Sequence, residues 1–365
     1  MPCAICYQKV AKLCGKCGSC KSHHAEDSTE FPMRKCRAWL AQCPLGHARC
    51  TGCGNCTTCK QICTCAKYLL NPLPRTLGVE LELSNLGGIN KMPPKNKHIS
   101  YHFEHDGSVT SGQELVTGIM QGDQYIYGMS ELIKSLQEFG CKTDKTCGYH
   151  VHVDALTYTP FDLRRVMIGF CTIQHQLFGT LVAKARESNM YCPPIPLVDV
   201  QLHDLAALEK PGQVSRWFYK YLYGLDSEPE GITAAEKLEQ QRYVKRRLAE
   251  LKAHKYENAA RRQALNFHSW MMRGTIEFRC KEGTTDPEDL LLWPLWCGWF
   301  IHKLGLMDDK EVFSWLKKPP TIQELSSRLT LKGRSPSMPE SIMQWVERKC
   351  EQAKPKAKRA SQEPF

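Results

Sequence analysis

The chain has 365 residues, of which 42% are hydrophobic and 24% are charged, and this composition suits one large globular domain with a small satellite. The sequence contains no run of about 18 apolar residues, which excludes a hydrophobic membrane-spanning helix. The first residues lack the charged stretch and apolar core of a secretory signal. We therefore expect a cytoplasmic protein, with a nuclear location as the alternative.

The chain is basic, with 49 Lys and Arg against 38 Asp and Glu and a net charge of +11. Such an excess suits a polyanionic partner, for example a nucleotide, an acidic substrate or a nucleic acid. Much of it lies in residues 1–70, where ten basic and three acidic residues accompany thirteen cysteines. Thiolates bound to zinc would cancel most of this local charge. Nucleic-acid binding is therefore possible but not the favoured interpretation.

Thirteen of the twenty cysteines lie in the first 65 residues, many of them separated by two residues. This spacing lets two thiolates bind one tetrahedral zinc ion, and in a reducing compartment it indicates metal rather than disulfides. The segment has too few hydrophobic residues for a core, so the ions must supply its folding energy. We predict a zinc-binding module at 1–70 with two to four Zn²⁺. Its candidate ligands are Cys3, Cys6, Cys14, Cys17, Cys20, His23, Cys36, Cys43, His47, Cys50, Cys53, Cys56, Cys59, Cys63 and Cys65.

The role of this module is open. A structural clip or docking element is one interpretation, and recruitment of a substrate or of nucleic acid is another. An iron–sulfur cluster is an alternative to zinc, because the same cysteine spacing suits such clusters. The pairing of the ligands cannot be deduced from the spacing.

Two further segments follow the stiff linker Asn71-Pro72-Leu73-Pro74. Residues 75–305 alternate strand and helix patterns, and residues 306–365 are expected to form short helices and a basic tail. The helices are not regular crossovers between strands, which favours an α+β domain with a largely antiparallel sheet flanked by helices. The expected strands are 77–83, 100–104, 113–119, 149–154 and 275–280.

Helices are expected between and after these strands. The first covers about 124–139 and ends at Gly140, and the second runs from the cap at Thr159-Pro160 to about Arg186. A basic helix is expected at about 234–260. The next begins at Asp286-Pro287, and its tryptophans at 293, 296 and 299 predict a buried helix face.

Acidic, histidine and arginine residues gather in five patches at these strands or their ends. In Gly78-Val-Glu80-Leu-Glu82, the two carboxylates are two residues apart and so point to one side of a strand. A face of this kind is costly to bury, but it suits divalent cations, which prefer oxygen ligands, and arginine suits phosphate. The other patches are His105-Asp106-Gly-Ser108 with Gly112-Gln113-Glu114, Gly148-Tyr-His150-Val-His152, Arg186 to Tyr191, and Gly274-Thr-Ile-Glu277-Phe-Arg279.

In this order, and together with Ala264-Leu265-Asn266, the patches of residues 75–300 resemble the amidoligase family. The catalytic domain of that family resembles glutamine synthetase and glutamate–cysteine ligase. The zinc module is not part of the resemblance.

The resemblance implies roles for individual residues. Glu82, Asp106 and Glu114 match the ligands of one metal ion, and Asp106 stands where the synthetase has a glutamate. Glu80, His150 and Glu277 match a second metal site. The positions that match phosphate or carboxylate contacts are His152 beside the nucleotide phosphates, Arg186, and Arg279 at the transferred phosphoryl group.

By the same resemblance, the protein would use ATP and two Mg²⁺ to join a carboxylate to an amine through an acyl phosphate. The two substrates are unknown, and one of them can be a protein or a peptide. Two alternatives stay open: a phosphotransferase of the same fold, and a non-catalytic scaffold that presents the zinc module on a degenerate ligase fold.

Overall fold

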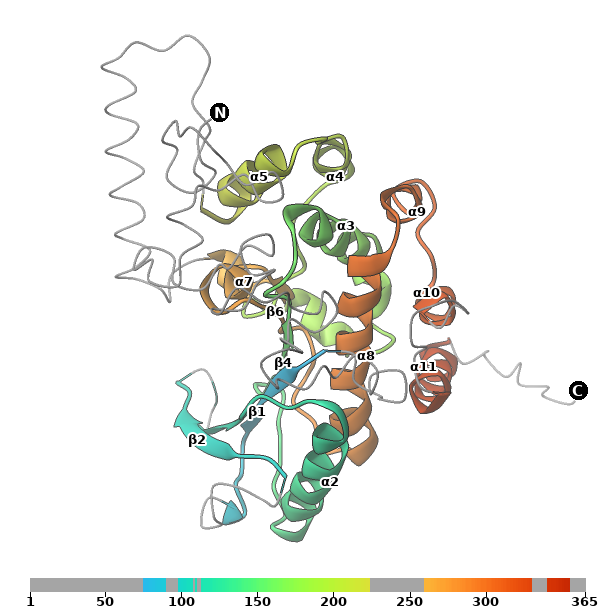
Figure 1. Cartoon of the computed structure of the whole chain (residues 1–365). Helices are drawn as coiled ribbons and strands as arrows, with labels where there is room; N and C mark the ends of the chain where they lie inside the picture. The colour runs from blue at the N-terminus through green and yellow to red at the C-terminus, as the bar shows by residue number, and fades with distance from the viewer. Residues whose placement is uncertain are drawn as a thin grey trace, which may run out of the picture.

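The computed structural model describes residues 75–89, 98–107, 109, 113–223, 259–329 and 340–354 (Figure 1). The predicted zinc module with all its candidate ligands, the proline-containing linker and the basic tail beyond residue 354 lie outside the described residues. The same is true of residues 234–258 of the predicted basic helix. Residues 259–262 are described and form a short 3-10 helix, η4 (Ala259–Arg262).

A six-stranded antiparallel sheet forms the centre of the described part, with the strand order β2-β3-β1-β4-β6-β5. The five predicted strands are present, with ends that differ by at most two residues from the predicted ones, which confirms the predicted antiparallel sheet. The bounds are β1 Leu77–Leu83, β2 Tyr101–His105, β3 Gln113–Thr117, β4 Tyr149–Asp154, β5 Leu265–Asn266 and β6 Thr275–Phe278.

The two faces of the sheet differ in chemistry because side chains alternate along each strand. In β1, Leu77, Val79 and Leu81 point to the hydrophobic core and are at most 2% exposed, whereas Glu80 and Glu82 point to the opposite face. Helices cover the apolar face: α2 (Gly122–Glu138), α3 (Pro160–Leu177) and α8 (Pro287–Leu306). Figure 1 shows α8 running along the sheet, with α2 and α3 packed against it.

The sequence places the first helix correctly and makes the second too long. Gly140 follows α2 with φ +61°, in the left-handed region that favours glycine. Helix α3 begins as expected, with the Thr159 side chain accepting from the backbone N–H of Asp162. It ends at Leu177 rather than near Arg186. Gly179 adopts φ +101°, which ends the helix, and Arg186 lies in the separate 3-10 helix η3 (Lys184–Ser188).

Helix α8 carries the centre of the core. The prediction of a buried tryptophan face is confirmed, since Trp293, Trp296 and Trp299 are fully buried. Phe278 of β6 meets Trp293 edge to face, with ring centroids 5.9 Å apart. The other α-helices among the described residues are α4 (Asp199–Ala206), α5 (Pro211–Tyr223), α7 (His268–Arg273), α9 (Asp309–Ser314), α10 (Ile322–Leu329) and α11 (Glu340–Ala353).

Helices α10 and α11 pack against α8, and the side chain of Trp345 in α11 is fully buried. Within the described residues, no helix has both the length and the apolar character needed to cross a membrane.

Candidate active site

The polar face of the sheet brings together predicted residues from four neighbouring strands. Glu82 of β1 lies opposite Glu114 of β3 in the register. On the other side of β1, Glu80 lies opposite His150 of β4, and His152 lies opposite Glu277 of β6. Directly opposite residues in an antiparallel pair share a face, so these six side chains converge.

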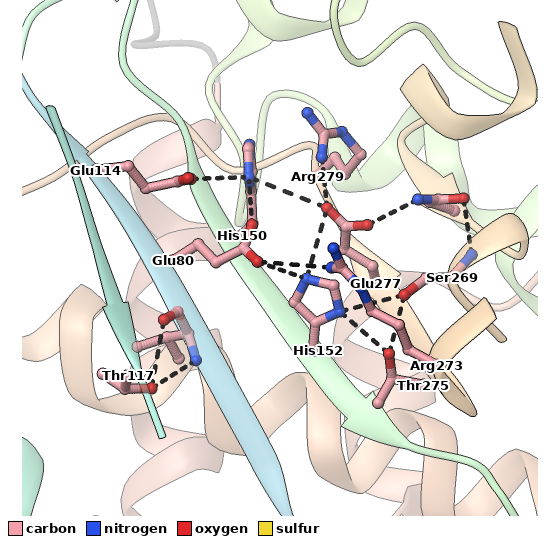
Figure 2. Close-up of polar contacts among 12 residues, drawn as sticks. Glu80, Glu114, Thr117, His150, His152, Ser269, Arg273, Thr275, Glu277 and Arg279 are labelled. Atoms are coloured by element: carbon pink, nitrogen blue, oxygen red, sulfur yellow. Dashed lines mark hydrogen bonds and ion pairs between the residues drawn. The ribbon is translucent and has the colours of Figure 1, made fainter. Parts of the chain in front are cut away.

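His150 lies in the middle of this group. Its Nδ1 atom is 3.4 Å from Glu80 Oε2 and 3.8 Å from Glu114 Oε1, and its Nε2 atom is 3.6 Å from Glu82 Oε1. Figure 2 shows Glu80 and Glu114 pointing toward His150 from their own strands. An imidazole surrounded by carboxylates at these distances can share a cation with them.

A glycine makes this close approach possible. The backbone N–H of Gly148 donates to Glu82 Oε2 over 2.5 Å, which fixes that carboxylate. A Cβ atom at residue 148 would lie 2.7 Å from His150 Nε2 and 3.3 Å from Glu82 Oε2. A side chain at this position would therefore displace His150.

His152 is held from one side and has a buried nitrogen on the other. Its Nδ1 atom lies 3.1 Å from Thr275 Oγ1 and 3.3 Å from Ser269 Oγ (Figure 2). Its Nε2 atom lies 3.1 Å from Glu80 Oε1 and 3.8 Å from Glu277 Oε1. Among the described residues, none gives this buried Nε2 atom a hydrogen bond of good geometry. Burial lowers the pKa of His152, but Glu277 and Glu80 outweigh it and raise the pKa above its ordinary value.

Glu277 is 3% exposed, and each of its oxygens has a nitrogen partner. Arg279 Nη1 donates to Oε1 over 2.5 Å, and Asn266 Nδ2 donates to Oε2 over 2.7 Å. Burial alone would raise the pKa of Glu277, but the positive charge of Arg279 and the contact with His152 lower it to about 2. The same pair raises the pKa of Arg279 against the effect of its burial. Both groups are therefore charged at neutral pH.

The carboxylates at the β1–β3 side repel one another. Burial and the neighbouring Glu80, Glu82 and Asp106 raise the pKa of Glu114 to about 9. For Glu80, burial would raise the pKa, but His152 and His150 lower it well below its ordinary value. A carboxyl group takes up a proton in such a cluster because positive charge is lacking there, and a divalent cation would supply that charge.

The donor set fits divalent cations at three places. The possible ligand atoms lie within 4.8 Å of one another in each of three groups: Glu82, Asp106 and Glu114; Glu80, Glu114 and His150; and Glu80, His152 and Glu277. The first group is the predicted one. The predicted second set had Glu277 beside Glu80 and His150, whereas these groups pair Glu277 with His152. The buried Nε2 atom of His152 supports the fit, and metal binding itself stays a prediction.

Arg186 is buried beside the carboxylate cluster, where a Cβ atom at residue 148 would lie 3.2 Å from its Nη2 atom. Its Nε atom donates to the carbonyl of Cys280 over 3.3 Å, and its Nη2 atom donates to the carbonyl of Arg279 over 3.2 Å. These bonds hold the backbone of Arg279 and Cys280, which directly follow β6. A contact of Arg186 with phosphate or a carboxylate stays a prediction.

Sequence reasoning gave no role to several residues that complete the site. Asn266, Ser269 and Thr275 contact its side chains, and Arg273 Nη1 lies 3.9 Å from Glu80 Oε1 with more than half of its side chain exposed. The sequence feature that could have identified them is their position beside the predicted motifs. Arg273 and Thr275 flank Gly274, which opens the motif of Glu277, and Asn266 ends another short motif.

Comparison with known proteins adds one match. The model of a family described as "Putative amidoligase enzyme" matches residues 94–301, which is more than half of the chain. This range contains β2 to β6 and most of the predicted site, while Glu80 and Glu82 on β1 precede it. No curated protein matches the chain.

Proposed function

This chain belongs to the amidoligase family, and from that premise we propose that it is an ATP-dependent carboxylate–amine ligase. The observation that carries the proposal is the convergence of five carboxylates, two histidines and Arg279 on the polar face of one sheet. This arrangement suits a reaction in which much negative charge must be held in place.

The proposed reaction has two steps. A carboxylate oxygen of the first substrate forms a bond to the γ-phosphorus of ATP while the bond to the β–γ bridging oxygen breaks, which gives an acyl phosphate and ADP. The nitrogen of the amine then bonds to the acyl carbon. Inorganic phosphate leaves, the nitrogen loses a proton, and an amide remains. Such phosphoryl transfer depends on positioning and charge stabilisation more than on covalent catalysis.

The residues would divide this work by location. Glu82, Asp106 and Glu114 would hold one Mg²⁺, and Glu80, His150 and Glu277 a second. His152, whose ligand atoms group with those of Glu80 and Glu277, would add its Nε2 atom to the second ion beside the nucleotide phosphates. Bound divalent cations would neutralise the phosphate charge. Arg279 would contact the phosphoryl oxygens while Glu277 fixes its guanidinium.

The zinc module extends the proposal to the N-terminal residues. We expect two to four Zn²⁺ in residues 1–70, bound by the clustered cysteines. Elemental analysis of the purified chain checks this number. Iron together with inorganic sulfide, or protein free of zinc, would contradict it.

The decisive experiment measures products. The full chain is incubated with ATP, Mg²⁺ and mixtures of small carboxylates, amines and peptides, and the products are identified by mass spectrometry beside a Glu80→Gln control. An amide together with ADP and phosphate supports the ligase. A phosphorylated acceptor as the end product would indicate the phosphotransferase, and equal ATP turnover by wild type and Glu80→Gln would contradict the proposed site.

A further inference from the structure

From the contacts beside Glu277 we infer that Asn266, at the end of β5, and Ser269, in the first turn of α7, are positioning residues. They hold Glu277 and His152 in the orientation needed to bind a divalent cation. This inference rests on the proposed function, because the proposed function makes Glu277 a ligand of a metal ion. Both side chains are buried and contact the site through Glu277 and His152. Each acts through the charged or basic group that it holds.

Asn266 is 1% exposed and makes two hydrogen bonds with different partners. Its Nδ2 atom donates to Glu277 Oε2 over 2.7 Å, and its Oδ1 atom accepts from the backbone N–H of Ser269 over 3.3 Å. The second bond fixes the side-chain amide to the start of α7, so the amide cannot turn away from Glu277. The strand register adds to this, since Asn266 lies directly opposite Glu277.

The bond from Asn266 leaves Glu277 with one oxygen for the site. Oε2 is occupied by the amide, and Oε1 faces Arg279 at 2.5 Å and His152 at 3.8 Å. A carboxylate without such a partner can rotate about its terminal torsion, which is broad. The amide therefore selects the rotamer in which Oε1 points toward the cluster.

Ser269 orients the ring of His152 as Asn266 orients the carboxylate of Glu277. Its hydroxyl lies 3.3 Å from His152 Nδ1 and 2.9 Å from Thr275 Oγ1, so the ring is held by two linked hydroxyl groups (Figure 2). Nδ1 is engaged on that side, and Nε2 faces Glu80 and Glu277. Partners behind ligating histidines and carboxylates orient them and tune their affinity for metal.

A purely structural role is the competing explanation for both residues. Any buried amide or hydroxyl must be hydrogen-bonded, and removing it costs stability whether or not it orients a ligand. Gln263 provides the matched control. It is buried three residues before Asn266 and accepts a hydrogen bond from the Tyr221 hydroxyl over 2.7 Å. Its contacts lie outside the carboxylate cluster.

The experiment titrates the zinc-loaded full chain with Mn²⁺ alone and measures free Mn²⁺ by electron paramagnetic resonance. Glu277→Gln first identifies the class of Mn²⁺ that depends on this carboxylate. We expect Asn266→Ala to weaken that class by about 10- to 100-fold, the usual effect of removing a partner behind a metal ligand. Gln263→Ala should bind Mn²⁺ like the wild type even if its melting temperature falls as much.

The possible outcomes separate the two proposals. If Glu277→Gln binds Mn²⁺ like the wild type, Glu277 is not a metal ligand, and that part of the proposed function fails. If Glu277→Gln weakens binding but folded Asn266→Ala does not, only the positioning inference fails. Should Asn266→Ala not fold, Ser269→Ala decides, because it removes one hydroxyl and keeps the backbone N–H. Wild-type affinity in Ser269→Ala would then overturn the inference.

Discussion

The two faces of the central sheet are made by the same strands but follow opposite rules. On one face Val79, Val151 and Phe278 are fully buried beneath helices, and burying such side chains stabilises the fold by about 1.5–3 kcal/mol each. On the other face Glu80, His150 and Glu277 lie at the same strand positions, shifted by one residue. Their burial costs free energy unless cations balance the charge. One strand sequence thus supplies both the stability and the candidate site.

The comparison teaches that residues adjacent in sequence should behave differently when changed. Phe278 lies between Glu277 and Arg279, yet its ring packs into the core, whereas the side chains of Glu277 and Arg279 face the polar side. Changes on the apolar face should lower stability first. Changes on the polar face should lower activity or metal affinity first, with small effects on stability.

The largest effect is expected from Phe278→Ala. The ring is fully buried and meets Phe170, Trp293 and Phe300 edge to face, so its removal leaves a cavity. Changes of this kind cost about 3–5 kcal/mol. Chemical denaturation monitored by tryptophan fluorescence measures the loss. A decrease below about 1 kcal/mol would mean that the two faces do not differ as described.

The next largest effect is expected from Glu82→Gln, and it should lower activity without a comparable loss of stability. The amide keeps an oxygen that can accept from Gly148 N–H, but it removes a charge needed at the predicted Mg²⁺ site. We expect ATP turnover to fall by at least about 100-fold, which is about 2.7 kcal/mol of barrier. The melting temperature should stay the same or rise, since one repelling charge is gone. Unchanged turnover, or a large decrease in melting temperature, would contradict the expected difference between the two faces of the sheet.

The substitution Gly148→Ala should have an intermediate effect. The new methyl group would lie 2.7 Å from His150 Nε2, so the imidazole must move, whereas the apolar face is untouched. We expect a loss of roughly 1–3 kcal/mol of stability, the usual cost of overpacking, and a higher KM for Mg²⁺–ATP. Steady-state kinetics at several Mg²⁺ concentrations check this, and Gly107→Ala, whose Cβ would meet nothing within 4 Å, is the control.

Sequence reasoning recovered the parts of this molecule that follow from local pattern. The alternation in residues 77–83 placed Glu80 and Glu82 on one face, and the tryptophan spacing of α8 placed its core side. The two-residue strand β5 gives no periodic signal, so its pairing with β6 was not foreseen, nor was the contact of Asn266 with Glu277. The sequence predicts Arg186 at the end of a long helix, which in the structure already ends at Leu177. Its contacts with the end of β6 depend on tertiary packing, which no spacing reveals.

The smallest effect tests the electrostatics of the polar face. In the metal-free protein the pKa of Glu114 is about 9, because burial and the neighbouring carboxylates favour its neutral form. The folded state then binds more protons than the unfolded chain between pH 4.5 and pH 9. This contribution to stability is complete below about pH 4.5 and is lost as the pH rises toward 9. In Glu114→Gln this part of the decline should disappear, a difference on the order of 1 kcal/mol, since water and relaxation reduce such energies. Denaturant midpoints at pH 6 and pH 9 with a chelator measure it, and Glu104→Gln, which changes an exposed carboxylate opposite Glu114, is the control. Added Mg²⁺ should flatten the wild-type decline because it binds the ionised form. A wild-type profile that Mg²⁺ leaves unchanged would mean that the repulsion at Glu114 does not reflect a cation site.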